Sequence, residues 1–282
     1  MSDSPVSRPF EGVQEQGPWE HAGPSAAAVM VAVLNLKGGS GKSTLATNLA
    51  RSLQRLGHAV LLIDTDAQGT LRHWQARQGR RSDQPPVVGL EPERFAEELG
   101  ALALGYDVVI VDGTAKVVQG VGYLVHLADL VLIPVQPSAA DLWAVSGLAE
   151  MVRTRRRMYG GCPQAAFVIS RQIPGARPAA PATLEAFELP VLQSRLTQRI
   201  VYAEALARGM TVLDVAPGGK AAREVEALRD EILARFPEVH RRLGASRRTR
   251  NRKMRLYRLE HREARPGGGS VPERPPDMPH ES

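Results

Sequence analysis

The chain has little cysteine, few aromatic residues and no long apolar run. Cys162 is the one cysteine among 282 residues, so neither a disulfide framework nor a paired-thiolate metal site is predicted. No apolar run approaches the roughly 20 residues of a membrane helix. The first residues carry Asp3, Glu11 and Glu15 rather than a basic region followed by an apolar block, so no secretory signal is predicted. We therefore expect a cytoplasmic protein in a reducing compartment.

Charge is distributed unevenly along the chain. The hydrophobic content of 43% and the aromatic share of 5% fit an α/β protein that buries one sizeable core. The net charge is +6, but residues 241–265 hold eleven basic and two acidic residues, a local +9. The rest of the chain therefore sums to −3, and any basic partner surface is concentrated near the C-terminal end.

Apolar strands alternate with helical patterns along most of the chain. We expect buried strands at 29–34, 59–64, 107–111, 130–135 and 165–170, an edge strand at 212–215, and helices at about 93–104 and 140–158. This alternation predicts an α/β fold with a doubly wound, mostly parallel sheet flanked by helices. We divide the chain into a disordered arm (1–28), one α/β domain (29–243) and a basic, partly disordered tail (244–282).

The first strand leads into the sequence KGGSGKST at residues 37–44, and a helical pattern follows. Glycines allow positive φ values and let backbone N–H groups close around phosphate oxygens. Lys42 is placed to reach the β- and γ-phosphates, and the Ser43 hydroxyl to bind Mg²⁺. The usual phosphate-loop pattern has a further glycine where this chain has Leu36, and here a second lysine, Lys37, opens the loop.

This form resembles the deviant Walker A phosphate loop of the ParA/MinD superfamily of ATPases. The resemblance implies a P-loop NTPase fold, ATP and Mg²⁺ as ligands, and an ATP-sandwich homodimer. In that dimer Lys37 would reach the phosphates of the partner subunit. The nucleotide-binding residues implied are Lys37, Gly38, Gly39, Ser40, Gly41, Lys42, Ser43 and Thr44.

Two acidic positions follow predicted strands, and strand C-termini are where such sheets collect ligands. Asp112 is placed like a Walker B aspartate, and Asp66 is similar to the switch aspartate that orients the attacking water. The predicted metal ligands are Ser43, Asp66 and Asp112, and the predicted catalytic residues are Lys37, Lys42 and Asp66. No arginine finger from the same chain is evident near this pocket, so basal hydrolysis should be slow and stimulated by a partner.

Later segments extend the resemblance to about residue 236. Residues 136–138 and 141–143 look like the dimer-interface segment of small partition ATPases, and residues 198–205 and 216–222 resemble their C-terminal signature. The resemblance implies that Pro217 packs on adenine. Residues 113–116, GTAK, depart from the usual turn after the Walker B aspartate, which leaves the geometry of the second switch open.

Basic residues suggest contact with nonspecific DNA. The candidates are Arg171, Arg199, Arg223, Arg229, Arg247, Arg248, Arg250, Arg252 and Lys253. The chain is most similar to small ParA-type ATPases without a helix-turn-helix domain. This implies a nucleoid-associated DNA partition ATPase stimulated by a centromere-binding ParB-type adaptor.

The alternative is a spatial regulator that cycles on a membrane, as MinD does, or positions another protein cargo. The apolar residues of the tail do not form one long stripe, which argues against a membrane-embedding helix. Iron-protein reductases and amide ligases share the loop. A reductase of that kind needs several cysteines to hold its cluster, and Cys162 alone cannot do so. A ligase would need an additional substrate site, and no residues for one are evident. A module that holds ATP without hydrolysing it also stays open.

Overall fold

The structure is a computed structural model that describes residues 28–79, 83–91, 94–113, 118–138, 141, 144–173 and 184–263. Three predictions lie largely outside these ranges. They concern the N-terminal arm, the end of the tail beyond Glu263, and the turn at Thr114, Ala115 and Lys116.

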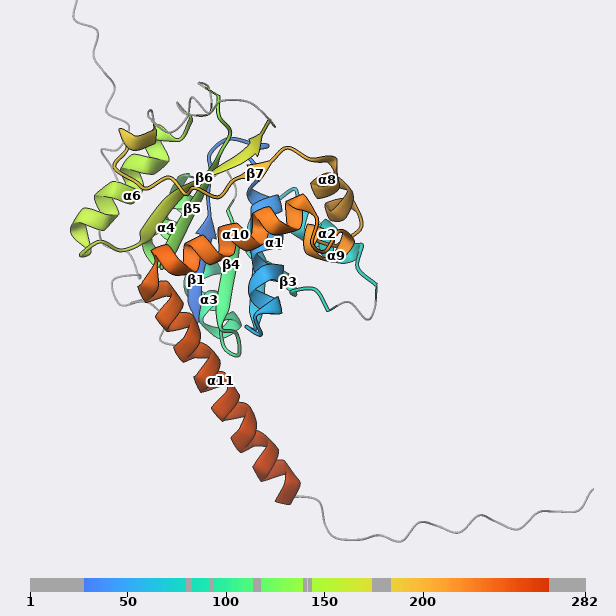
Figure 1. Cartoon of the computed structure of the whole chain (residues 1–282). Coiled ribbons are helices and arrows are strands. Elements are labelled where there is room, and N and C mark those ends of the chain that lie inside the picture. The colour runs from blue at the N-terminus through green and yellow to red at the C-terminus, as the bar shows by residue number, and fades with distance from the viewer. Residues whose placement is uncertain are drawn as a thin grey trace, which may run out of the picture.

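A seven-stranded parallel sheet forms the centre of the molecule (Figure 1). Its strands are β1 (Val29–Val33), β2 (Val60–Asp64), β3 (Val87–Gly89), β4 (Val108–Asp112), β5 (Leu130–Val135), β6 (Gln164–Gln172) and β7 (Leu196–Thr197). The strand order is β3-β2-β4-β1-β5-β6-β7. Because β1 pairs with both β4 and β5, the order reverses at β1, and a ligand crevice is expected at its carboxyl end.

Helices cover both faces of the sheet, which confirms the predicted doubly wound fold. One face packs against α1 (Lys42–Arg55), α2 (Thr70–Ala76), α8 (Ile200–Ala207), α9 (Val212–Val215), α10 (Lys220–Arg235) and α11 (Pro237–Glu263). The other packs against α3 (Phe95–Leu102), α4 (Val118–Leu127) and α6 (Ser146–Met158). Successive residues of β1 point to opposite faces, so Val31 joins the first core and Met30 the second.

The predicted edge strand at 212–215 is wrong, because this segment forms the short helix α9. Thr211 and Asp214 make a capping box, in which each side chain hydrogen-bonds the other residue's backbone N–H. This pairing satisfies N–H groups at the helix start and outweighs the strand propensity of Val212 and Val215. The actual edge strand, β7, has two residues and gives no apolar run to recognise.

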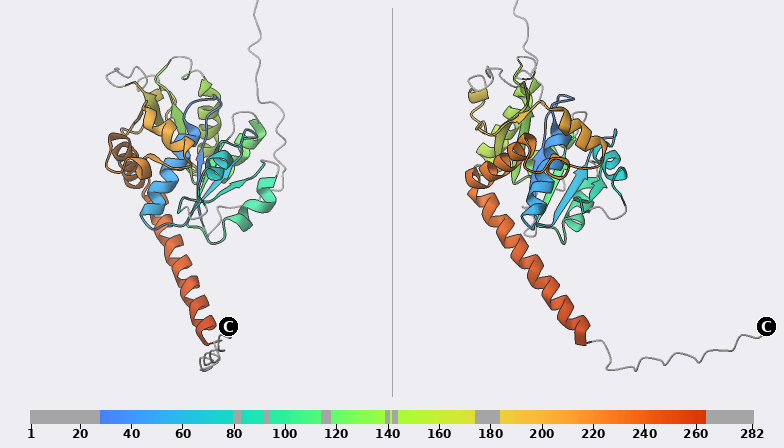
Figure 2. Two further views of the ribbon diagram at one scale, coloured as in Figure 1. Left: turned by 90° about the vertical axis from the view of Figure 1, so that its right-hand side faces the viewer. Right: turned by 45° about the vertical axis from the view of Figure 1, so that its right-hand side comes forward.

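Helix α11 runs through the predicted domain boundary at 243/244 and leaves the domain at the end opposite the phosphate loop (Figures 1 and 2). Its first half is anchored by arginines. Arg242 pairs with Asp129, and Arg247 donates to the Leu56 carbonyl. The Arg250 Nε donates to both carboxylate oxygens of fully buried Asp107, at 3.0 and 3.1 Å. Among the described residues, no helix is long and apolar enough to span a bilayer.

Candidate functional site

The loop between β1 and α1 has the backbone that its glycines permit. Gly39 and Gly41 have φ values of +73° and +95°, in the left-handed region. A Cβ added at Gly41 would lie 2.6 Å from the Ser170 Oγ, so the position also requires the absence of a side chain. Gly41 is the N-cap of α1, and no side chain caps the helix there. The first N–H groups of α1 therefore remain available to an anion.

Side chains from β5 and β6 hold the outer side of this loop. The Ser170 hydroxyl donates to the Ser40 carbonyl at 2.5 Å. The Gly39 carbonyl accepts from the Gln136 Nε2 at 2.8 Å and from the Arg171 Nη1 at 2.9 Å. The Ser40 side chain is fully buried, and its Oγ has no hydrogen-bond partner among the described residues. A buried hydroxyl without a partner beside vacant helix N–H groups fits a phosphate-binding loop.

The two lysines of the loop have different partners. The Lys42 Nζ donates to the Lys37 carbonyl at 3.0 Å, and burial lowers the pKa of Lys42 while the carboxylates of Asp112 and Asp66 oppose that shift. The Lys37 Nζ lies 2.8 Å from the Oδ2 of Asp141, whose side chain is 2% exposed. The Ser138 hydroxyl donates to the same Oδ2. In this state Lys37 is held within its own subunit.

Asp112 lies at the carboxyl end of β4, beside Asp64 on β2. Burial raises the pKa of Asp112 to about 7, although a hydrogen bond with the Ser43 hydroxyl lowers it. Burial disfavours the charged form of this carboxyl, but a bound divalent cation would favour it, so Asp112 would ionise when such a cation is present. The Ser43 hydroxyl, Asp112 and nearby Asp66 form the oxygen-rich donor set that Mg²⁺ prefers, so these residues fit the ion.

The loop after β2 is held by Arg72. The carboxylate of Asp64 accepts from the backbone N–H groups of Asp66 and Arg72, each at 3.0 Å. The Arg72 Nη2 donates to the Asp66 carbonyl at 2.9 Å. The Asp66 carboxylate accepts from the Gln68 N–H and remains half-buried, where a ligand at the phosphate loop can reach it.

The structure thus brings the predicted loop residues, Asp66 and Asp112 to one edge of the sheet. Pro217 is exposed in the turn between α9 and α10, and its contact with adenine stays a prediction.

The residues predicted to contact DNA do not gather on one surface. Arg199 pairs with Glu224, Arg229 with Asp230, and Arg223 donates to the Gly218 carbonyl. Arg247 and Arg250 anchor α11 at the far end, Arg248 is exposed on the same helix, and the side chains of Arg252 and Lys253 lie outside the described residues.

Two arginines contact the loops of this pocket. Arg171 contacts the phosphate loop, and Arg72 contacts the segment that carries Asp66. Sequence reasoning assigned Arg171 to DNA and passed over Arg72 and Ser170. Their position in the sequence could have indicated this contact. Ser170 and Arg171 follow the apolar run of β6, so they lie at the same edge of the sheet as the phosphate loop.

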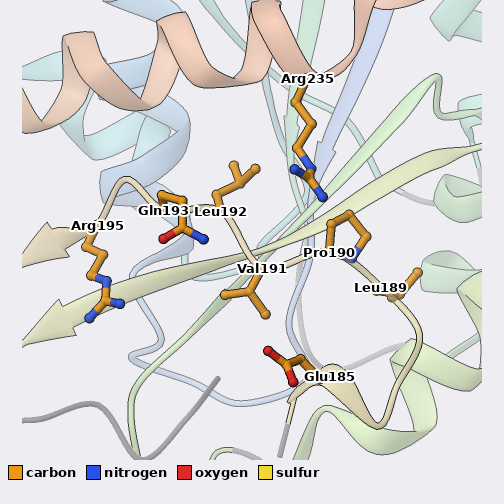
Figure 3. Close-up of a pocket in the computed structure, with 8 residues that line it drawn as sticks. All are labelled: Glu185, Leu189, Pro190, Val191, Leu192, Gln193, Arg195 and Arg235. Carbon is orange, nitrogen blue, oxygen red and sulfur yellow. The ribbon is translucent and has the colours of Figure 1, made fainter. Parts of the chain in front are cut away.

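A separate cavity of about 330 Å³ lies between α10 and the segment 189–195. Figure 3 shows Arg235 of α10 extending toward Pro190, with Glu185 beyond the segment. None of its lining residues belongs to the phosphate loop, so it is distinct from the site described above.

Comparison with known proteins assigns the chain to a family. The model described as CbiA, the CobQ/CobB/MinD/ParA nucleotide binding domain, matches residues 31–212. The chain belongs to this family. Members of the ParA/MinD branch are nucleotide-binding ATPases, as the sequence resemblance predicted.

Two relatives and one solved structure resemble the chain over most of their length. It is 33% identical to the Maintenance of carboxysome distribution protein A of Halothiobacillus neapolitanus, over 73% of this chain and 97% of the relative. It is 25% identical to the chromosome-partitioning ATPase Soj of Thermus thermophilus, over 74% and 97%. The MinD cell division protein of Aquifex aeolicus superimposes with a TM-score of 0.61 at 16% identity, over 73% and 98%, which supports the fold.

Proposed function

We propose that this chain is a positioning ATPase, which uses ATP-dependent pairing of two copies to distribute a protein cargo in the cell. The observation that carries the proposal is its 33% identity to a protein named for maintaining carboxysome distribution, against 25% to the partitioning ATPase Soj. The first match includes 97% of that relative, so it is not limited to the phosphate loop. The proposed cargo is a protein assembly.

The contacts at the phosphate loop support ATP as the energy source. The free N–H groups at the start of α1 and the Lys42 ammonium would bind the β- and γ-phosphates. Ser43 and Asp112 would hold Mg²⁺, which supplies charge neutralisation on the phosphate oxygens. Asp66 would accept a hydrogen bond from the attacking water and orient it. We expect slow hydrolysis until an adaptor on the cargo stimulates it.

Lys37 would change partner during the cycle. In the structure its ammonium is paired with Asp141 inside one subunit. In the ATP-bound homodimer it would leave Asp141 and contact the phosphates of the partner subunit. The lysine side chain is 39% exposed but the Asp141 side chain is 2% exposed, so the exchange would leave a buried carboxylate without its cation, and the new contact with the partner's phosphates would have to offset that cost. This transfer would couple the nucleotide state to dimer formation.

The second candidate is DNA partition with a ParB-type adaptor, which the Soj relative favours. Both functions would use nonspecific DNA as the surface on which dimers bind, and both predict a nucleoid-associated protein. The basic residues of α11 support DNA contact in either case. What separates the two functions is the cargo.

The first experiment measures phosphate release and binding to an arbitrary DNA duplex with ATP, with ADP and without nucleotide, for the wild type and Lys42→Ala. The proposal expects ATP-dependent DNA binding that the variant loses. Binding that ignores nucleotide would count against it. The second experiment deletes the gene in its host. Clustering of a protein assembly with normal DNA segregation supports cargo positioning, whereas cells without a plasmid or chromosome support partition.

A further inference from the structure

Arg171 occupies a backbone conformation that its side chain does not favour. Its φ of +52° lies in the left-handed region, where a residue with a Cβ is strained. It also falls at an irregularity in the pairing of β6 with β7. Ser170 pairs with Leu196 and Gln172 with Thr197, so Arg171 is the extra residue of the register shift. Bulges of this kind redirect a side chain, and strain of this kind persists where the surrounding structure maintains it.

The redirected side chain reaches the phosphate loop. The Arg171 Nη1 donates to the Gly39 carbonyl at 2.9 Å, and the Gln136 Nε2 donates to the same oxygen at 2.8 Å. These donors come from the ends of two neighbouring strands, β6 and β5. Because Gly39 has a positive φ and no side chain, its own conformation does not fix the direction of this carbonyl.

We propose that Arg171 is a positioning residue of the nucleotide site, which fixes the peptide between Gly39 and Ser40 so that the Ser40 N–H points into the loop. In a trans peptide the carbonyl of one residue and the N–H of the next point in opposite directions. Two donors that hold the Gly39 carbonyl toward β5 and β6 therefore hold the Ser40 N–H toward the opposite side. The inference rests on the proposed nucleotide site.

Ser170 orients the next peptide of the loop, between Ser40 and Gly41, in the same way. Its hydroxyl holds the Ser40 carbonyl at 2.5 Å, which directs the Gly41 N–H. The outer contacts of the loop therefore set two consecutive N–H donors before a nucleotide arrives. Ser170 is buried, whereas Arg171 is exposed, so Arg171 can be replaced without opening the core.

The role predicts which ligands Arg171 affects. An oriented N–H in the loop binds phosphates shared by ADP and ATP, so loss of Arg171 should weaken both nucleotides equally. A guanidinium that contacted the γ-phosphate directly would affect ATP alone. This difference separates positioning from direct contact.

The test is titration of the full-length protein with fluorescent ADP and fluorescent ATP analogues in Mg²⁺. We expect Arg171→Ala to weaken both by about five- to tenfold, the size of a charged hydrogen bond that is partly open to water. Arg171→Lys should recover part of the loss. The matched control, Arg208→Ala, removes an exposed arginine whose side chain has no ion pair or hydrogen bond among the described residues, and should bind like wild type.

A third variant separates positioning from general stability. Arg171→Gly relieves the left-handed strain, so it should melt at a higher temperature than Arg171→Ala while binding nucleotide equally weakly. Affinity that follows the melting temperature would overturn the inference. So would Arg171→Ala binding both nucleotides like the control, or a loss confined to ATP. Wild-type protein that binds neither nucleotide would overturn the proposed nucleotide site together with this inference.

Discussion

Replacing Arg250 should destabilise the domain and release the end of α11. Arg250 makes three hydrogen bonds at the far end of the sheet, from Nε to each Asp107 carboxylate oxygen and from Nη2 to the Gly57 carbonyl at 3.2 Å, and its Nη2 also lies 3.0 Å from the Asp107 Oδ2. Asp107 is fully buried and keeps its hydrogen bond from the Ala59 N–H at 2.8 Å. Arg250→Ala would therefore leave a buried carboxylate without its main cation.

The expected loss follows from this geometry. Removing one partner of a buried pair costs about 3–5 kcal/mol. The Arg250 side chain is 27% exposed, so water can enter the space it leaves, and we lower the expectation to about 2–4 kcal/mol. For a domain of this size that corresponds to a fall in melting temperature of about 5–15 °C.

The assay is chemical or thermal unfolding of Arg250→Ala beside Arg248→Ala, which removes an exposed arginine from the same helix. Hydrogen exchange in the second half of α11 should be faster in Arg250→Ala alone. Adding Asp107→Asn to Arg250→Ala removes the stranded charge and should recover part of the stability. If Arg250→Ala is as stable as Arg248→Ala, the anchoring argument is refuted.

Three further predictions concern the loop, the pH response and the tail. Gly41→Ala would place a Cβ 2.6 Å from the Ser170 Oγ at a φ of +95°, so nucleotide affinity measured by titration should fall more than tenfold by our rough estimate. Gly147→Ala in α6, where a Cβ would meet no atom within 4 Å, should leave the affinity nearly unchanged, and equal losses would contradict this. The raised pKa of Asp112 means that the folded protein keeps a proton up to about pH 7, whereas the unfolded chain releases it near 3.8. Stability without Mg²⁺ should therefore fall as the pH rises between these values, by up to about 4 kcal/mol, and Asp112→Asn should show a flatter profile in urea unfolding. Truncation after Asn251 should preserve the fold and test DNA binding by the basic tail, whereas truncation after Gly244 also removes Arg247 and Arg250; unchanged DNA affinity after truncation at Asn251 would refute a role for residues 252–282.

The sheet could be predicted from the sequence because its strands are buried on both faces. Residues 108–111 and 130–135 are continuous apolar runs, and such runs are typical of parallel strands covered by helices. The segment 212–215 was misassigned because Val-Leu-Asp-Val satisfies strand propensity, while the capping pair of Thr211 and Asp214 decides its structure. The order of the strands depends on tertiary packing and was not predicted.

The phosphate loop could be predicted because its residues are contiguous. Its glycines, Lys42 and Ser43 belong to one stretch, and local geometry determines their positions. The residues that orient the loop from outside could not be predicted in the same way. Gln136 and Arg171 lie about 100 and 130 positions along the chain from the carbonyl that they share, and only the pairing of β1, β5 and β6 brings them together.

Both outer strands of the sheet are very short, with three residues in β3 and two in β7. Short edges offer few free backbone groups to a neighbouring chain, which disfavours joining two copies by extending one sheet into the next. A sheet shared between two copies would be held by many hydrogen bonds, so the loss of one phosphate would not separate the copies. In the proposed homodimer, copies that meet through charged side chains around the nucleotide would separate when that phosphate leaves, and assembly would stay reversible at each turnover.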